Sequence, residues 1–214
     1  MTMKILEVKS LAIPDVKVIR FARFNDHRGY FTETFRQSDF DNDKNMGFLS
    51  GVKFKQINEG YSFAGTFRGL HFQWNPYMGK LVRCVFGHLI DYALDIRKNS
   101  PSLGKIIGYD LPTRHTDDFN EWIWLPPGFA HGILLTVDSK VEYFCSGEYS
   151  QGCEASISPL AKDIDWGLCD RTIKARFDLT VPTTKLITDK DKNGLTMKAW
   201  LDDKRSDNFI YGKV

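Results

Sequence analysis

An arginine and a histidine lie three residues apart in the segment Phe67-Arg68-Gly69-Leu70-His71-Phe72-Gln73. A guanidinium can bind a phosphate, and an imidazole can take up a proton near neutral pH. The pair therefore suggests chemistry on a phosphorylated or nucleotide-linked substrate. In a regular strand Arg68 and His71 would point to opposite faces. A bulge at Gly69 would shift the alternation and turn both side chains into one cavity. Without a bulge, a surface arginine and a hydrogen-bonded core histidine would be the plainer interpretation.

Short β-like runs separated by turn residues fill most of the chain. Such runs, without alternating βαβ units, indicate an all-β sandwich or barrel. The predicted strands include Lys80–Phe86, Leu89–Ile96, Ile106–Leu111 and Trp122–Leu125, and the range Val18–Phe35 holds further runs interrupted at Asn25–Gly29. Alternation within one of these strands puts Asp91 and Asp95 on the same face.

Three stretches fall outside this β pattern. The polar range Arg36–Asn45 predicts a short helix capped at Ser38. The mixed range Ala161–Phe177 predicts a second short helix. The charged residues after about Lys198 predict either a loose tail or a subunit contact.

Composition narrows the class of protein. The 214 residues fit one large domain, and a formal net charge of +2 gives no field that would favour nucleic acid or an anionic membrane. The four cysteines show no C-x-x-C spacing, so a zinc site is not expected. The chain start lacks the apolar run of a signal peptide, and no stretch approaches the ~20 apolar residues of a membrane span. We therefore expect a cytoplasmic protein with free thiols and no nucleic-acid or membrane partner.

An ordered series of motifs runs through the centre of the chain. Its members are Asp26-His27-Arg28-Gly29-Tyr30-Phe31, Gln56-Ile57-Asn58, Arg68-Gly69-Leu70-His71-Phe72-Gln73, Gly79-Lys80-Leu81-Val82-Arg83, Asp95-Ile96-Arg97 and Pro127-Gly128-Phe129-Ala130-His131-Gly132. The series resembles the dTDP-4-dehydrorhamnose 3,5-epimerase family (the RmlC family) of deoxysugar biosynthesis. The resemblance spans about residues 14–195.

This resemblance implies an architecture and an assembly. The fold would be an all-β jelly-roll (cupin-like) barrel with a few short peripheral helices, and residues 1–214 would form a single domain. Its core would span about 14–195 and a C-terminal extension about 198–214. The family also implies a homodimer in which N-terminal elements reach the neighbouring site, with no metal and no cofactor.

The implied reaction is epimerisation at C3, at C5 or at both carbons of a nucleoside-diphospho-4-keto-6-deoxyhexose, with dTDP-4-dehydro-6-deoxyglucose as the first choice of substrate. A ketone at C4 acidifies the hydrogens on C3 and C5. A base removes one of them, an acid on the opposite face returns a proton, and the carbon is inverted. The intermediate enolate oxygen needs a cation or a hydrogen-bond donor.

The resemblance assigns the base to His71, whose unperturbed pKa of about 6.5 suits proton removal near neutral pH. Asp191, within Lys190-Asp191, matches the family's aspartate, which would fix the tautomer of the base and raise its basicity. Tyr143 matches the proton donor, and Lys80 matches the residue that stabilises the enolate oxygen. Taken alone, Lys190-Asp191 is typical of a solvated turn and Tyr143 of an ordinary strand aromatic.

Nine further residues match the family's binding positions. Arg28 and Arg68 match contacts to diphosphate or sugar, which a planar guanidinium can hold with two hydrogen bonds. Arg28 and Glu33 are expected to serve the neighbouring subunit's site. The other matches are Gln56, Asn58 and His131 for sugar and nucleotide, Tyr149 for stacking on the base, and Glu154 and Lys190 for further contacts.

The chain departs from the family pattern on the side of the proton donor. Phe144 stands where a lysine usually follows the donor tyrosine, Ser150-Gln151-Gly152 replaces a proline-containing turn, and an insertion occupies about Leu168–Thr184. These changes leave open whether C3, C5 or both carbons are inverted, and which nucleotide and sugar are used.

Three alternatives to a double epimerase remain. One is a monoepimerase acting on another activated 4-ketosugar. A second is a metal-dependent cupin oxygenase using His71 and His131, although no His-x-His cluster is present. A third is a sugar-nucleotide-binding module without catalysis, against which the combination of His71, Asp191 and Tyr143 argues.

Overall fold

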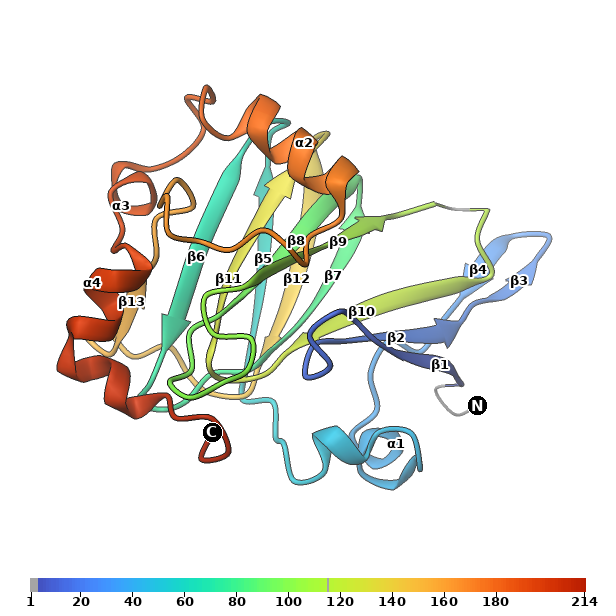
Figure 1. Ribbon diagram of the computed structural model, residues 1–214. Coiled ribbons are helices and arrows are strands. Elements are labelled where there is room, and N and C mark those ends of the chain that lie inside the picture. Colours follow the sequence, from blue (N-terminus) through green and yellow to red (C-terminus); the bar gives the residue numbers. More distant parts are fainter. Residues whose placement is uncertain (1–3, 115) are drawn as a thin grey trace.

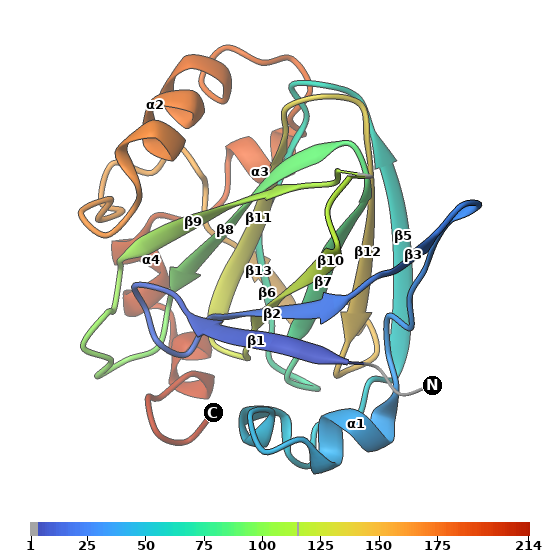
Figure 2. The same cartoon turned by 90° about the vertical axis from the view of Figure 1, so that its right-hand side faces the viewer.

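Strands with alternating burial build two antiparallel sheets that face one another, with the helices at the periphery (Figure 1, Figure 2). The computed structural model describes residues 4–114 and 116–214. Among these residues the six-stranded sheet, here called sheet I, has the order β1-β2-β10-β7-β12-β5, and the five-stranded sheet II has the order β13-β6-β11-β8-β9. This arrangement confirms the predicted all-β jelly-roll fold with a few short helices.

The strand bounds agree closely with the predicted runs. Sheet I consists of β1 (Ile5–Ser10), β2 (Lys17–Ala22), β10 (Phe119–Leu125), β7 (Lys80–Phe86), β12 (Ser139–Cys145) and β5 (Gln56–Ser62). Sheet II consists of β13 (Glu154–Ser156), β6 (Phe67–Gln73), β11 (Phe129–Leu135), β8 (His88–Asp95) and β9 (Ile106–Pro112). A separate hairpin pairs β3 (Phe24–Asp26) with β4 (Gly29–Phe31). Strand β10 begins three residues before the predicted Trp122 because Phe119 still pairs with Ala22 of β2.

The inward-facing side chains of the two sheets form an apolar core, and a cavity adjoins this core. Val82 of β7 and Val141 of β12 belong to this core, packed with apolar residues of β8 and β11. Side chains two positions along a strand share a face. The next inward residues are therefore Lys80 and Tyr143, and both line the cavity.

The C-terminal part of the chain covers the outer face of sheet II. It contains α2 (Arg171–Thr180), α3 (Asp189–Lys192), α4 (Met197–Asp202) and the 3-10 helix η2 (Lys204–Asn208). Trp200 and Phe209 are fully buried there, and the Trp200 ring meets the Phe72 ring at a centroid distance of 4.6 Å. The loose-tail prediction for residues after Lys198 is therefore wrong, because these residues complete the apolar cluster on sheet II.

The outer face of sheet I is covered by α1 (Gln37–Asn42) and the 3-10 helix η1 (Gly47–Leu49), which bury Phe40 against β2 and β10. The short helix was predicted here, but its cap at Ser38 was wrong. The carbonyl of Arg36 accepts the backbone N–H groups of Asp39 and Phe40, so Arg36 is the N-cap residue, α1 starts at Gln37 and Ser38 lies inside it.

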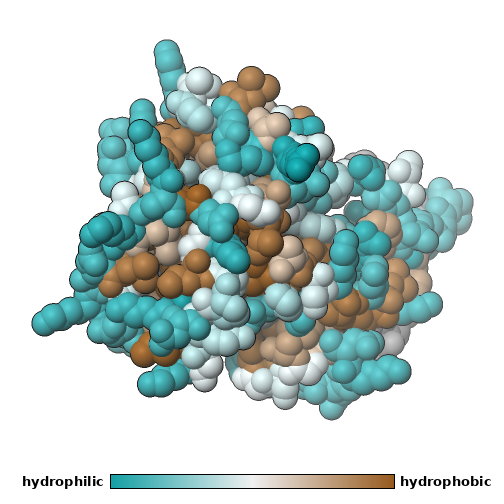
Figure 3. All heavy atoms as spheres, viewed as in Figure 1, coloured by the Kyte–Doolittle hydropathy of each residue, from teal (hydrophilic) through white to brown (hydrophobic). Residues whose placement is uncertain are grey.

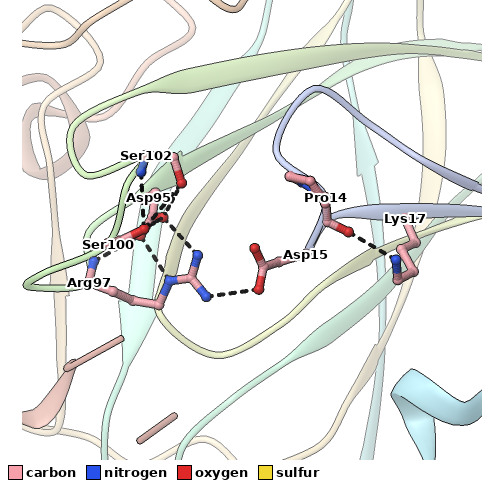
Figure 4. Close-up of polar contacts among 7 residues, drawn as sticks. All are labelled: Pro14, Asp15, Lys17, Asp95, Arg97, Ser100 and Ser102. Carbon is pink, nitrogen blue, oxygen red and sulfur yellow. Dashed lines mark hydrogen bonds and ion pairs between the residues drawn. The ribbon is translucent and has the colours of Figure 1, made fainter. Parts of the chain in front are cut away.

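The buried guanidinium of Arg97 ties the N-terminal loop to sheet II (Figure 4). The Arg97 guanidinium lies between Asp95 at 2.7 Å and Asp15 at 3.1 Å, and the hydroxyls of Ser100 and Ser102 also donate to Asp95. The buried Arg97–Asp95 pair is weak evidence for net stability, because desolvation of the two charges offsets their attraction. Arg97 sets the loop between β1 and β2 against the turn that follows β8.

Hydrophobic patches on the face seen in Figure 1 are broken up by hydrophilic side chains (Figure 3). Within the described residues, no helix has the length and apolar character needed to cross a membrane. All four cysteines are free thiols, and three of them are buried.

Candidate active site

Strand β6 contains a bulge at Gly69, the condition under which the sequence would bring Arg68 and His71 to one face. Arg68 and His71 both line the cavity, whereas Phe67 and Leu70 point into the cluster on the outer face of sheet II. The pairing of β6 with β11 shifts at this point, and Gly69 has a φ of +131°. A Cβ at Gly69 would lie 2.4 Å from the Cα of Gly132, so a larger residue does not fit. The extra residue brings the phosphate-binding candidate and the candidate base to the same face.

A cavity of about 480 Å³ lies between the sheets and gathers most of the predicted site residues. All four residues predicted for catalysis line it: His71, Lys80, Tyr143 and Asp191. Seven predicted binding residues line it as well: Gln56, Asn58, Arg68, His131, Tyr149, Glu154 and Lys190. Six lining residues were not predicted, namely Phe72, Gln73, Met78, Ile133, Cys145 and Thr188.

His71 and Asp191 form a tight pair although 120 residues separate them. The imidazole Nε2 lies 2.7 Å from Asp191 Oδ1, and the backbone N–H of Gly69 donates to Oδ2 at 3.3 Å. Asp191 is buried, so the solvated-turn interpretation of Lys190-Asp191 is wrong. Burial opposes ionisation of this carboxyl, but the hydrogen bond to His71 holds its pKa below the usual range. An ionised Asp191 fixes the proton on Nε2 and leaves Nδ1 as the nitrogen that can accept one.

Tyr143 enters the cavity from the opposite sheet. It lies on β12 of sheet I, whereas His71 lies on β6 of sheet II. Its ring meets the His131 ring edge-on, with centroids 6.2 Å apart. Burial raises the pKa of the Tyr143 phenol well above its usual range, so the group keeps its proton at neutral pH. A neutral phenol from sheet I and the His71–Asp191 pair from sheet II therefore line the same cavity.

Lys80, Asp91 and His131 form a second polar group at the cavity wall. His131 Nε2 lies 2.8 Å from Asp91 Oδ2, and both side chains are buried. Burial lowers the pKa of Lys80 and of His131, and it raises the pKa of Asp91. Among the described residues, Asp91 Oδ1 has no hydrogen-bond partner.

Asp91 was not predicted as a site residue, although a signal for it was present. It interrupts the inward series of β8 between the apolar residues Leu89 and Ala93. A carboxylate at an inward strand position needs a buried partner. Which partner it meets depends on β11, whose His131 lies next to Ala93 of β8.

The cavity rim carries a hydrogen-bonded group around Tyr149. The Tyr149 hydroxyl donates to Glu154 at 3.0 Å, and Glu154 also pairs with Lys190 at 2.9 Å. The backbone N–H of Tyr149 donates to the side chain of Gln56 at 2.8 Å. The Tyr149 side chain is otherwise exposed, so a flat group can stack on its ring.

Arg28 and Glu33 lie apart from the cavity of their own chain. Arg28 sits in the turn between β3 and β4, its side chain is 78% exposed, and it pairs with Asp26 at 2.6 Å. Glu33 follows β4 and pairs with Arg36. In both ribbon views the β3–β4 hairpin projects beyond the two sheets (Figure 1, Figure 2).

The alternative of a metal-dependent oxygenase rested on His71 and His131. These residues are neighbours across β6 and β11, but each directs Nε2 at a carboxylate oxygen. Within residues 4–114 and 116–214, no three His, Cys, Asp or Glu side chains are grouped to hold a metal ion.

The fold and the cavity together define a class of protein: a cupin-like jelly roll with a candidate acid–base site between its sheets. The family model described as dTDP-4-dehydrorhamnose 3,5-epimerase matches residues 10–199, and the chain belongs to this family. A Shigella flexneri dTDP-4-dehydrorhamnose 3,5-epimerase is 37% identical over 191 residues, which cover 88% of this chain and 94% of the relative.

Two solved structures illustrate the range of similar enzymes. RmlC of Legionella pneumophila, a dTDP-6-deoxy-D-glucose-3,5-epimerase in complex with dTDP-4-keto-L-rhamnose, superposes with a TM-score of 0.78 at 26% identity and covers 97% of this chain and 99% of its own. ChmJ, a 3'-monoepimerase from Streptomyces bikiniensis in complex with dTDP-quinovose, gives a TM-score of 0.73 at 26% identity and covers 90% of this chain and 89% of its own.

Proposed function

We propose that this chain epimerises C3 and C5 of a dTDP-4-keto-6-deoxyhexose, with dTDP-4-dehydro-6-deoxyglucose as its substrate. One observation carries the proposal: the His71–Asp191 pair and the Tyr143 phenol approach the same cavity from opposite sheets. Epimerisation requires this arrangement because the proton must leave one face of the carbon and return to the other. Family membership and the dTDP-sugar complexes of the similar enzymes support the substrate class.

In the proposed mechanism, Nδ1 of His71 takes the proton from the carbon next to the ketone, while the ionised Asp191 stabilises the resulting imidazolium. The electron pair of the broken C–H bond moves into the enolate, whose oxygen faces the Lys80 ammonium. The Tyr143 O–H then gives its proton to the opposite face of the carbon. The phenolate regains a proton from solvent and the His71 imidazolium releases its proton to solvent, so both groups return to their starting states. General acid and base groups of this kind each contribute about 10²–10⁴-fold in rate.

The remaining lining residues are proposed to bind the nucleotide and the sugar. Arg68, whose Nε donates to Ser62, would hold the diphosphate with its guanidinium. Tyr149 would stack on the base at the rim. Gln56, Asn58, His131, Glu154 and Lys190 would supply further polar contacts.

A monoepimerase is the second candidate. The superposition on the 3'-monoepimerase ChmJ is nearly as close as that on the 3,5-epimerase RmlC. In addition, Phe144 follows Tyr143 on β12 and packs into the cluster outside sheet I, so this chain lacks the family's usual lysine beside the proposed donor.

We also propose a homodimer in which the β3–β4 hairpin of one subunit contributes Arg28 and Glu33 to the site of the other. Exposed apolar side chains support this interface, with Phe31 on the hairpin 62% exposed and Ile57 on the edge strand β5 61% exposed. The proposed location is the cytoplasm, because a substrate with a charged diphosphate does not cross a lipid bilayer unaided.

Proton NMR in D2O with dTDP-4-dehydro-6-deoxyglucose tests the proposal. Exchange at C3 and C5 with formation of the inverted product is expected, whereas exchange at one carbon alone identifies a monoepimerase. His71→Ala should abolish exchange at both carbons, and Tyr143→Phe should lower product formation more than proton removal.

Matched controls exist for both variants. His88 pairs with Asp110 at 2.6 Å outside the cavity, and the Tyr92 ring lies in the cluster outside sheet II. His88→Ala and Tyr92→Phe should exchange like the wild type. Full exchange by His71→Ala, or unchanged product formation by Tyr143→Phe, would contradict the assigned roles.

A further inference from the structure

Asp191 sits on a helix too short to hold its own position. Helix α3 has four residues, Asp189–Lys192. Forming the first turn of a helix costs more conformational entropy than one hydrogen bond returns, so such a turn persists only when contacts around it fix the backbone. The direction of the Asp191 carboxylate toward His71 therefore depends on what anchors the two ends of α3.

The C-terminal end of α3 is anchored to sheet II. The Ser158 hydroxyl donates to the carbonyl of Lys192 at 2.7 Å, and Leu195 exchanges backbone hydrogen bonds with Ser156 and Ser158 at 2.9 Å each. Ser156 is also the β13 residue that pairs with His71 of β6. These contacts set the end of the helix relative to the strand that carries the proposed base.

The N-terminal end is anchored by Thr188. Its Oγ1 accepts the backbone N–H of Asp191 at 3.2 Å, which is the contact of an N-cap residue with the third residue of a helix. The carboxylate is held at the same time by His71 on Oδ1 and by the Gly69 N–H on Oδ2. The Thr188 hydroxyl also contributes to the lowered pKa of Asp191, after the larger effects of burial, which opposes it, and of His71.

We propose that Thr188, which lines the cavity, is a positioning residue for the epimerase base: it holds the backbone of Asp191, and Asp191 in turn orients His71. The inference rests on the proposed function, because it needs His71 to act as the base. Thr188 does not touch the reacting carbon in this scheme. Its contribution is to keep Nδ1 of His71 aimed into the cavity by fixing the group bonded to Nε2.

The chain supplies a matched control in Thr196. This residue caps α4 in the same way, with Oγ1 accepting the backbone N–H of Ala199 at 3.0 Å. Helix α4 packs Trp200 against the outer face of sheet II and carries no lining residue of the cavity. Loss of either threonine hydroxyl removes a capping hydrogen bond of the same kind. Only the helix capped by Thr188 carries a residue, Asp191, that is bonded to the proposed base.

The experiment compares Thr188→Val, Thr188→Ser and Thr196→Val in the full-length protein by rates of hydrogen exchange from the substrate in D2O. Thr188→Val should lower kcat for exchange by about 10-fold, because small displacements of catalytic groups are costly, while KM changes by less than about twofold. Thr188→Ser should retain wild-type exchange because it keeps the capping oxygen. Thr196→Val should lower the Tm about as much as Thr188→Val does and leave exchange unchanged.

A double-mutant cycle with Asp191→Asn separates positioning from a general structural effect. If Thr188 acts through Asp191, adding Thr188→Val to Asp191→Asn should not lower the exchange rate further. The slow exchange of these variants is measured over long incubations. Full exchange by Thr188→Val, an equal loss in both backgrounds, or an equal loss by Thr196→Val would overturn the inference. Wild-type exchange by Asp191→Asn would also overturn the inference, because Asp191 would then have no role in proton removal. Absence of exchange by the wild-type protein would instead overturn the proposed function itself.

Discussion

Lys80 is a buried residue of the cavity, and its burial as a charged group costs the folded protein stability. Burial lowers its pKa, whereas the nearby Cys145, Asp91 and Glu154 act in the opposite direction. Desolvation disfavours the ammonium form, so a folded chain that carries this charge has lost stability relative to one with an apolar residue there. Such a cost is typical of groups that are kept for chemistry.

Replacement of Lys80 by methionine should therefore stabilise the protein and inactivate it. A folded-state pKa below the unfolded value of 10.5 means that the unfolded chain binds the proton more tightly. The penalty is full below the folded pKa, declines as the pH rises toward 10.5 and is absent above it. Urea unfolding should show Lys80→Met to be more stable than the wild type at pH 7, with the gain shrinking toward pH 10.

Exchange from the substrate should fall by about 100-fold or more in Lys80→Met, because the enolate oxygen loses its cation. Lys140 provides the control, since it lies on β12 of the same sheet with its side chain 41% exposed. Lys140→Met should change neither activity nor the pH dependence of stability. A destabilised Lys80→Met protein at pH 7 would contradict the argument.

At the scale of elements, the bulge in β6 is the feature on which the site depends. One extra residue puts Arg68 and His71 on the cavity side and leaves Phe67 and Leu70 on the outer face. The same segment turns the N–H of Gly69 toward Asp191. A positive φ and the close approach of β11 restrict this position to glycine.

Gly69→Ala should therefore destabilise the protein by about 3 kcal/mol, through strain at positive φ and a clash with the backbone of Gly132. Unfolding in urea measures this loss. Gly60 in β5 is the matched control, because a Cβ there would meet nothing within 4 Å. Gly60→Ala should have a free energy of unfolding close to that of the wild type. A Gly69→Ala protein as stable as the wild type would contradict the argument, because β6 would then accommodate a Cβ at this position.

At the scale of the whole molecule, the projecting hairpin points to an assembly larger than one chain. Arg28 and Glu33 match family binding positions, yet both lie outside the cavity formed by their own subunit. A twofold dimer would resolve this mismatch, since each subunit would then complete the site of the other.

Mixed dimers test this arrangement. Arg28→Ala and His71→Ala should each be nearly inactive alone, but co-expressed with different tags they should regain activity. A mixed dimer places both defects in one site and leaves the other intact, so random pairing predicts about one quarter of wild-type activity. A mixture of His71→Ala with Tyr143→Phe should regain nothing, because each site keeps one defect. Tagged mixed dimers of Arg28→Ala and His71→Ala without activity would place Arg28 in its own subunit's site.

Local patterns predicted much of the fold. The bounds of β7 agree with the predicted run, and the arginine, glycine and histidine of β6 raised the possibility of a bulge at Gly69, which the structure contains. Alternation and turn chemistry are short-range properties, so a single sequence contains them. The cap at Ser38 failed because the start of α1 follows from the packing of Phe40 beneath it, which no local signal reveals.

For the site as well, the sequence predicted some features and only the structure revealed others. The sequence by itself determined the types of group present, a histidine, a tyrosine, a lysine and arginines in motifs that resemble a known family. Only the tertiary structure decided that Asp191 is buried against His71, that Asp91 supports His131, and that the chain after Lys198 packs onto sheet II. The reason is physical: these contacts join residues far apart in the chain, and they arise from strand pairing and from the docking of short helices that have little stability of their own.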